Sequence, residues 1–526
     1  MDPPRAGHLA IALSGGGHRA TLFAVGALLA LVDRGLNRDV AQISSVSGGS
    51  IANAFVAQRC HFDQLGPGDL DPVAAELVGT IVNRGVLTRR WITGIIGCSI
   101  AAGLAAGALL WVLGVPAVLI PFISLIVSFG LLLTSGLVVQ RLLDRRYFRP
   151  DGKTGTLGSL ADRTVEHTFC STDLVLGQPV YFSSWGGGSA WRRTARTGGA
   201  PSGLRYGADN LALAEVVRAS SAFPGIPPLR LRVDAKLAGP VRSKSRGDAA
   251  PPGTLFLADG GLWNNLGSHV LREDGVVRGT EGAGRAMVLL CVNSSAASAA
   301  SAPATYSIPV VAQFAALFRT LRVLTVNTVQ PRVDAVAEAM ARRNAAGTRP
   351  GPLDPLDVVV DLTSVRRHEV SIRALCRDRA QLRRSDPVHD RYHREVVEHL
   401  AAWAATVDGD PSPADSTRLS ALVRDALGDR PEGSAEGIGL LDVEILDDLD
   451  AQGWWATLRS HTGPENLAVR TTLDRVDREN AAELVLRGYA NTWLSSLLID
   501  SRNGGSAPPP PAAHIVERVH RMVGQP

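Results

Sequence analysis

The feature that most constrains this chain is a stretch of 49 residues, 91–139, without a single charged side chain. One helix needs about 20 apolar residues to cross a bilayer, so the stretch is long enough for two. Pro116 and Pro121 lie near its middle, where a turn is favoured because proline lacks a backbone N–H. The sequence predicts helices at about 91–114 and 118–139 that form an inserted transmembrane hairpin.

Arginine flanks this stretch on both sides, with Arg89 and Arg90 before it and Arg141, Arg145 and Arg146 after it. Arginine and lysine accumulate on the cytoplasmic side of membranes, so both ends are expected there. The expected location is integral to the cytoplasmic (inner) membrane, with the catalytic domain on the cytoplasmic side. A buried hairpin in a large soluble core, a re-entrant loop and a monotopic embedding are alternatives that hydropathy alone leaves open.

The composition of the chain limits its partners. Its 526 residues are 45% hydrophobic, which is ample for a large core, and the net charge is only +4. Without a localised basic patch, nucleic acid is not an expected partner. The five cysteines are scattered, with no CxxC pair and no histidines at metal-ligand spacing, so no metal is expected. Residues 1–10 lack the apolar region of a cleaved secretory signal, which favours a cytoplasmic catalytic part.

The N-terminal part alternates between strand and helix patterns. An apolar strand at 8–13 leads through a glycine run into a helix at about 21–33, and a strand at 40–46 leads into a second helix. The fold class predicted is α/β, a three-layer sandwich with a mainly parallel central sheet plus the inserted hairpin. Further elements are expected as strands at 174–182, 254–258 and 287–292 and as a helix at 211–221.

Ser47 lies between the second strand and the second helix, which is the setting of a nucleophile elbow. The residues two before and two after such a serine must be small, as Ser45 and Gly49 are. The usual pattern has glycine in place of Ser45, so a serine-rich turn is the alternative. Gly48 and Gly49 are expected to support the loop.

Gly15, Gly16 and Gly17 open the first helix, where backbone N–H groups have no intrahelical acceptor and form an anion site. A Walker loop would need Gly-Lys-Ser/Thr, and a GxGxxG dinucleotide loop is not matched. We therefore expect an oxyanion hole for a serine on the next strand. Arg19 is expected to brace the loop, to meet a lipid phosphate or simply to be solvated, and His18 is expected at the surface.

Asp259 follows an apolar strand and precedes Gly260 and Gly261, whose lack of side chains permits close backbone approach. It is the candidate base for Ser47, although an Asp-Gly pair is ordinarily just a turn. Only about two strands precede Ser47, and no histidine stands in a turn that marks it as a base. A Ser-Asp dyad therefore fits better than a Ser-His-Asp triad.

Three ordered motifs, the glycine loop 14–20, the Ser47 elbow and Asp259 with its two glycines, resemble those of the patatin-like phospholipases. The glycine loop is also similar to that of cytosolic phospholipase A2 catalytic modules. Segments 173–182, 218–228 and 473–491 resemble secondary motifs of the patatin-like family. The resemblance implies a lipid acyl hydrolase that cleaves fatty-acyl esters through an acyl-enzyme, with membrane lipid as substrate, the bilayer as partner and no cofactor.

Two other functions remain as alternatives: a catalytically silent membrane scaffold, and a pore or transport component built on the hairpin. Against the second, the hairpin lacks the charged residues that conducting segments generally use. The expected domain organisation has a core that is interrupted by insertions. Its parts are 1–90, first part of the core; 91–140, hairpin; 141–295, second part of the core; 296–470, a mostly helical extension outside the resemblance; 471–495, closing helix; and 496–526, Pro-rich spacer and amphipathic tail helix.

Overall fold

The computed structural model describes most of the core and the hairpin. The described ranges, apart from a few single positions, are 9–86, 89–149, 152–160, 164–197, 200–222, 226–241, 254–271, 288–294, 357–362, 452–462, 473–500 and 509–524. Most of the expected extension 296–470 therefore lies outside the described residues.

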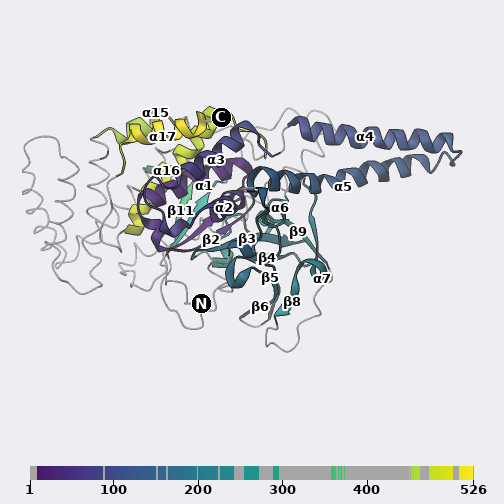
Figure 1. Ribbon diagram of the computed structural model, residues 1–526, viewed down its shortest axis with the longest axis horizontal. Helices are drawn as coiled ribbons and strands as arrows, with labels where there is room; N and C mark the ends of the chain where they lie inside the picture. Colours follow the sequence, from purple (N-terminus) through teal and green to yellow (C-terminus); the bar gives the residue numbers. More distant parts are fainter. Residues whose placement is uncertain are drawn as a thin grey trace, which may run out of the picture.

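One mixed sheet of eleven strands forms the centre of the described structure (Figure 1). Its main path runs β11-β10-β1-β2-β3-β4-β5-β6-β8, and β9 pairs with β3 and β7. The strands are β1 Leu9–Leu13, β2 Val40–Ser45, β3 Glu166–Asp173, β4 Gln178–Ser183, β5 Ser189–Thr197, β6 Ala200–Gly207, β7 Leu229–Arg232, β8 Ala238–Val241, β9 Thr254–Asp259, β10 Val288–Asn293 and β11 Asp357–Asp361.

Only one half of this sheet is parallel. The pairs from β11 through β10, β1 and β2 to β3 are parallel, whereas β4, β5, β6 and β8 follow in antiparallel pairs. The connections between β3, β4, β5 and β6 are short, and short connections join antiparallel strands because a parallel pair needs a long crossover. The α/β class predicted from the sequence therefore takes the form of a mixed sheet.

Strand alternation places the core. β1 sends Leu9, Ile11 and Leu13 into the large core beneath the helices, and Ala10 and Ala12 into a small cluster on the other face. The helices are α1 Gly17–Asp33, α2 Gly48–Arg59, α3 Asp71–Asn83, α4 Arg89–Val112, α5 Ile120–Tyr147, α6 Leu213–Ser220, α7 Val233–Lys236, α8 Gly261–Asn264, α15 Trp454–Ser460, α16 Arg478–Asp500 and α17 Ala512–Gly524. The second helical layer of the predicted sandwich is not seen within the described residues.

Helix α1 is buried along its whole length because α2 and α16 pack beside it (Figure 1). A helix that is apolar on all sides requires such cover. Helix α16 contains most of the expected closing helix, and α17 is the tail helix. The apolar face expected of α17 is buried, and its residues are Ile515, Val516, Val519, Met522 and Val523.

Strands β2 and β9 approach each other end to end along the same edge of β3. The full length of β4 pairs with one edge of β3. On the other edge, Ser45 at the end of β2 lies opposite Phe169, and Asp259 at the end of β9 lies opposite Ser171. The residues that follow β2 therefore meet the end of β9 in the middle of the sheet.

The charge-free stretch forms two helices, α4 and α5, which pair with each other and project from the body (Figure 1). Small residues form their contact, since a Cβ on Gly107 would lie 2.7 Å from Oγ of Ser124. The helical hairpin of the prediction is therefore present.

The expectation that this hairpin is transmembrane is wrong. Within the described residues, none of the helices combines the length and the apolarity that crossing a bilayer requires. The prediction relied on the absence of charge alone, but both helices place glycine, alanine, serine or threonine between their large apolar residues. The last turns of α5 carry Asp144, Arg145 and Arg146, and they bury Leu143 and Tyr147 in the core of the body.

Candidate active site

Ser47 stands on a sharp turn between β2 and α2. Its φ of 51° and ψ of −118° make it the single non-glycine residue with positive φ among those the structure describes. An L-residue reaches such angles only at a cost of about 1–3 kcal/mol, and strain of this kind collects at functional sites. A nucleophile elbow has this strand, strained serine and helix.

Two glycines after Ser47 make the turn possible. A Cβ on Gly48 would overlap the carbonyl oxygen of Gly17, and a Cβ on Gly49 would lie 2.6 Å from the carbonyl oxygen of Leu13. Thr21 Oγ1 donates a 2.8 Å hydrogen bond to the Gly48 carbonyl and ties the two loops together. The elbow and the glycine loop are thus in direct backbone contact, and the supporting role of Gly48 and Gly49 stays a prediction.

Ser220, at the end of α6, holds the backbone of the elbow. Its Oγ accepts a hydrogen bond from the Ser47 N–H at 3.0 Å, and its carbonyl oxygen accepts from the same N–H at 3.1 Å. The Ser220 hydroxyl in turn donates to the carbonyl of Cys170 on β3 at 2.7 Å. Sequence reasoning did not assign Ser220 a role, and its only signal was the run of small residues that ends α6.

Asp259 ends β9 and is fully buried beside Ser47. Burial raises the pKa of its carboxyl from 3.8 to about 6, opposed by hydrogen bonds from the Gly261 N–H and from the Ser47 side chain. The Gly261 bond measures 2.7 Å to Oδ1. The structure thus brings Ser47 and Asp259 together, with the aspartate held in one orientation; the roles of the two residues stay predictions.

The backbone N–H groups of the glycine loop differ in whether they have a hydrogen-bond acceptor. The Gly15 N–H donates to the carbonyl oxygen of Asn265 at 2.9 Å, which occupies it. Gly16, with φ of 148°, and Gly17 are the N-cap and the first residue of α1, and their N–H groups have no acceptor among the described residues. Only Gly16 and Gly17 therefore remain available to an oxyanion.

Ser45 occupies the position at which the sequence pattern favours glycine. Its hydroxyl donates to the carbonyl of Thr168 at 3.1 Å and accepts hydrogen bonds from Ser50 Oγ at 3.2 Å and Asn53 Nδ2 at 2.9 Å. A buried hydroxyl is tolerated when it is hydrogen-bonded in this way. The departure at Ser45 is therefore accommodated by polar partners around the elbow.

Arg19 and His18, which follow the glycine loop, are both buried. A Cβ on Gly16 would lie 3.4 Å from Nη2 of Arg19, so the guanidinium lies against the loop, and its bracing role stays a prediction. His18 was expected at the surface, and this expectation is wrong. The ring of His18 is enclosed because the end of α5 packs over it, with Tyr147 Oη 3.1 Å from Nε2.

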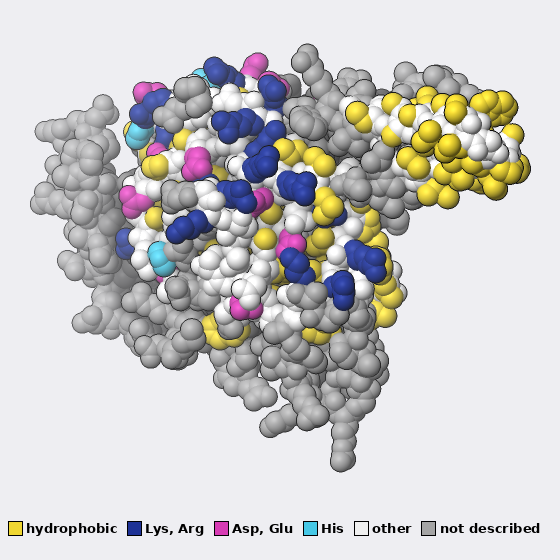
Figure 2. All heavy atoms as spheres, turned by 45° about the vertical axis from the view of Figure 1, so that its right-hand side comes forward, with side chains coloured by type: hydrophobic (Ala, Val, Ile, Leu, Met, Phe, Trp, Pro, Cys, Tyr) yellow, Lys and Arg dark blue, Asp and Glu magenta, His cyan; other side chains and the backbone are white. Residues whose placement is uncertain are grey.

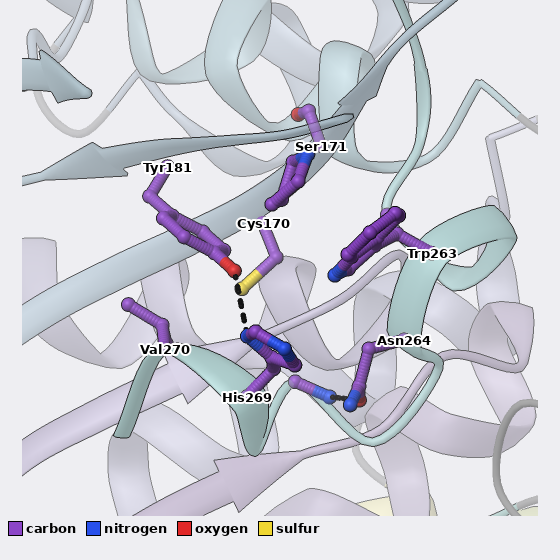
Figure 3. Close-up of a pocket in the computed structure, with 10 residues that line it drawn as sticks. Cys170, Ser171, Tyr181, Trp263, Asn264, His269 and Val270 are labelled. Atoms are coloured by element: carbon purple, nitrogen blue, oxygen red, sulfur yellow. Dashed lines mark hydrogen bonds between the residues drawn. The ribbon is translucent and has the colours of Figure 1, made fainter. Parts of the chain in front are cut away.

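A small pocket adjoins the turn after Asp259 (Figure 3). Tyr181 and Cys170 line it from the sheet, and Trp263 and His269 line it from the segment after Gly260. Ser47 is not part of its wall, so the elbow and the pocket are separate features. No cluster of three His, Cys, Asp or Glu side chains that could hold a metal occurs in the part of the chain described here.

No protein-family model and no curated protein matches the chain. The similar solved structures include human GIVD cytosolic phospholipase A2, with 12% identity, a TM-score of 0.41 and coverage of 98% of this chain and 61% of the human one. The chain thus spans less than two thirds of that enzyme. VipD from Legionella pneumophila matches with 12% identity, a TM-score of 0.24 and coverage of 93% and 92%.

Full-length ExoU in complex with full-length SpcU, from the type III secretion system of Pseudomonas aeruginosa, matches with 14% identity, a TM-score of 0.19 and coverage of 92% and 77%. These likenesses are remote, and the local geometry at Ser47 is the stronger guide to chemistry.

Proposed function

We propose that this chain is a serine acyl-ester hydrolase of the patatin-like type that acts on membrane lipids, with Ser47 as nucleophile and Asp259 as base. One observation carries the proposal. A strained serine between a strand and a helix lies beside a buried aspartate whose pKa is raised by burial to about 6. A serine hydroxyl needs an adjacent base to become a nucleophile, and this aspartate is in place to accept its proton.

In the proposed reaction, Asp259 takes the hydroxyl proton as Ser47 Oγ attacks the carbonyl carbon of a fatty-acyl ester. The carbonyl oxygen becomes an oxyanion that accepts hydrogen bonds from the Gly16 and Gly17 N–H groups, reinforced by the N-terminus of α1. The alcohol leaves with the proton from Asp259, and Ser47 carries the acyl group. Water then attacks this ester and gives a proton to Asp259. The fatty acid departs as the Ser47 oxygen takes the proton back from Asp259.

The surface of the hairpin supports an association with lipid. Its exposed large apolar residues are Ile100, Leu104, Leu109, Trp111, Val112, Leu113, Val118, Leu119, Phe122, Leu125, Ile126 and Leu137. Figure 2 shows hydrophobic side chains gathered on the projecting hairpin. Large exposed apolar patches on a protein surface mark interaction sites. Because the apolar residues lie on both helices and on the turn between them, a lipid surface fits them better than a single protein face would.

Charge and cysteine chemistry suit the cytoplasmic face of a membrane. Arg141 and Arg145 are exposed where α5 joins the body, a position that favours anionic headgroups. The cysteines that the structure describes form no disulfide, which is compatible with a reducing compartment. We propose that the hairpin docks on this face.

The catalytic proposal is tested with a fluorophosphonate probe and with acyl release from phospholipid vesicles. Wild type is expected to react with the probe and to release fatty acid, and Ser47→Ala is expected to do neither. Ser159→Ala, which changes an exposed serine remote in the sequence, is the matched control and should behave as wild type. Labelling of Ser47→Ala at the wild-type rate would refute the proposal, and a folded but unreactive wild type would favour a silent scaffold.

The docking proposal is tested by co-sedimentation with anionic vesicles. A Leu104→Ser, Trp111→Ser, Leu125→Ser triple variant is expected to bind at least about tenfold more weakly, because each large apolar side chain contributes on the order of 1.5–3 kcal/mol when it leaves water. Leu174→Ser with Val175→Ser, which removes exposed apolar residues elsewhere, is the control. Equal losses in both variants would show that the hairpin has no special part in binding.

A further inference from the structure

We propose that the stem of the hairpin, the last turns of α5, positions both loops of the Ser47 site, through Tyr147 on the glycine loop and through Gln140 on the elbow. This inference rests on the proposed hydrolase function. It assigns Tyr147, Gln140 and Arg218 as positioning residues that touch no substrate and act through the residues they hold.

Helix α5 changes its surroundings along its length. Leu125 is 67% exposed and Leu137 is 52% exposed, whereas Val139, Leu143 and Tyr147 are fully or almost fully buried. The same continuous helix is therefore part of the exposed hairpin at one end and part of the core at the other. A helix of this kind transmits a displacement of the hairpin directly to whatever its buried end contacts.

The first contact of the stem is with the start of α1. Tyr147 Oη lies 3.1 Å from His18 Nε2, and His18 Nδ1 lies 2.6 Å from the carbonyl oxygen of Asp474. A carbonyl can only accept, so Nδ1 carries the proton of the ring and Tyr147 donates to Nε2. Burial lowers the pKa of His18 to about 4, so the ring is neutral and this pattern is fixed at ordinary pH.

His18 directly follows Gly17, one of the two proposed oxyanion donors, so the orientation of its ring and that of the loop are linked. The Tyr147 ring also packs edge to face against Phe55 of α2, with centroids 6.3 Å apart. Tyr147 therefore touches both helices that begin at the site, α1 behind the glycine loop and α2 behind Ser47.

The second contact of the stem is with α6. Arg218 Nη1 donates to Gln140 Oε1 at 3.0 Å, and Arg218 is buried without a carboxylate in hydrogen-bond contact among the described residues. Two residues further on, Ser220 accepts the Ser47 N–H, and its carbonyl also accepts the Gly260 N–H at 3.3 Å. The stem thus contacts the end of α6 two residues before Ser220, which joins the elbow to the turn after Asp259.

Gly136 lets the stem approach Arg218 closely because it has no side chain. A Cβ at this position would overlap Nη2 of Arg218, the far end of a flexible side chain. Gly136→Ala should therefore push the guanidinium away from Gln140 without displacing backbone. Gly97→Ala makes the same change on the same hairpin where nothing lies within 4 Å, and it is the matched control.

The experiment measures kcat and KM on a water-soluble short-chain ester, the rate of fluorophosphonate labelling and the urea midpoint of unfolding, all with full-length protein. A misplacement of about 1 Å costs on the order of 100-fold in rate. We expect Tyr147→Phe, Gln140→Leu and Gly136→Ala to lower kcat about 10- to 100-fold, with KM within about twofold of wild type because binding contacts are intact. Gly97→Ala should match wild type.

A conservative variant separates positioning from general stability. Gln140→Glu keeps an acceptor for Arg218 and should retain most of the activity that Gln140→Leu loses, at a similar urea midpoint. Equal kcat in Gln140→Leu, Tyr147→Phe and wild type would overturn the inference while leaving the hydrolase proposal intact. If wild type itself neither turns over the ester nor reacts with the probe, the hydrolase proposal fails first.

Discussion

The elbow and the hairpin place side chains in opposite ways. Around Ser47, polar residues such as Ser45, Ser50, Asn53 and Ser220 are buried and hydrogen-bonded to one another or to backbone. On the hairpin, leucines, isoleucines and tryptophan are exposed. A soluble domain ordinarily does the reverse with both classes of residue.

The buried polar network and the exposed apolar surface affect stability in different ways. A buried polar network is costly unless every member is satisfied, but once satisfied it fixes one arrangement of the chain. An exposed apolar surface contributes nothing to folding and becomes favourable only against a partner. The comparison therefore predicts large effects on catalysis from small changes near Ser47, and small effects on folding from large changes on the hairpin.

The largest effect is expected from Asp259→Asn. An asparagine cannot accept the Ser47 proton, so we expect ester hydrolysis to fall about 10³- to 10⁴-fold, as when other catalytic carboxylates are neutralised. Activity on a soluble ester at pH 8 measures the change. A loss of less than about tenfold would mean that Ser47 draws on another base.

The same substitution should stabilise the protein at neutral pH. The pKa of Asp259 is raised in the folded state from 3.8 to about 6, so its contribution to stability is fully present below pH 4 and is lost as the pH rises through 6. The uncharged asparagine side chain avoids that loss, which is on the order of 3 kcal/mol at pH 8. Urea unfolding of Asp259→Asn and wild type at pH 5 and pH 8 tests this, and an advantage that is equal at both values would contradict it.

Gly48→Ala should cost less activity than Asp259→Asn. The added Cβ overlaps the Gly17 carbonyl and must separate the elbow from the oxyanion loop. We expect a fall of about 100- to 1000-fold, comparable to the loss of one oxyanion donor. Gly94→Ala on the hairpin, where nothing lies within 4 Å, is the control in the same kinetic assay. Similar activity in the two alanine variants would separate the elbow from catalysis.

The pH dependence of activity should follow the Asp259 carboxylate. Below its pKa of about 6 the group is protonated and cannot act as a base, so the rate should fall about tenfold for each further pH unit and be level above pH 7. A profile of kcat/KM between pH 4.5 and 8.5 reports this value. A midpoint near 4 would indicate that the carboxylate is far more solvated than its burial implies.

Much of the parallel half of the fold was accessible from the sequence because its strands are apolar. Leu9–Leu13, Val40–Ser45 and Val288–Asn293 were placed nearly where the structure has them. Strand β3 was missed because it carries Glu166, Thr168 and Asp173, all buried, in place of an apolar run. Periodicity arguments fail for a central strand whose polar side chains find buried partners, as Glu166 does with Ser183.

The site shows the same division. Ser47 and Asp259 were predicted from local motifs, because glycines and strand ends leave a mark in sequence. Their meeting beside β3 depends on strand pairing, and the anchoring by Ser220 depends on α6. The use of the Gly15 N–H by Asn265 and the burial of His18 beneath Tyr147 are tertiary facts that leave no local signal.

The smallest effect on the free energy of unfolding is expected for substitutions on the exposed hairpin. Helix α5 contains both a buried and an exposed leucine for this comparison. Leu143 is fully buried and Leu125 is 67% exposed. Leu143→Ala should lower the free energy of unfolding by about 2–5 kcal/mol because it leaves a cavity in the core. Leu125→Ala should change it by less than about 0.5 kcal/mol in urea titrations. If both substitutions cost the same, the hairpin packs against the body or another copy in solution, and its apolar surface would no longer be available to lipid.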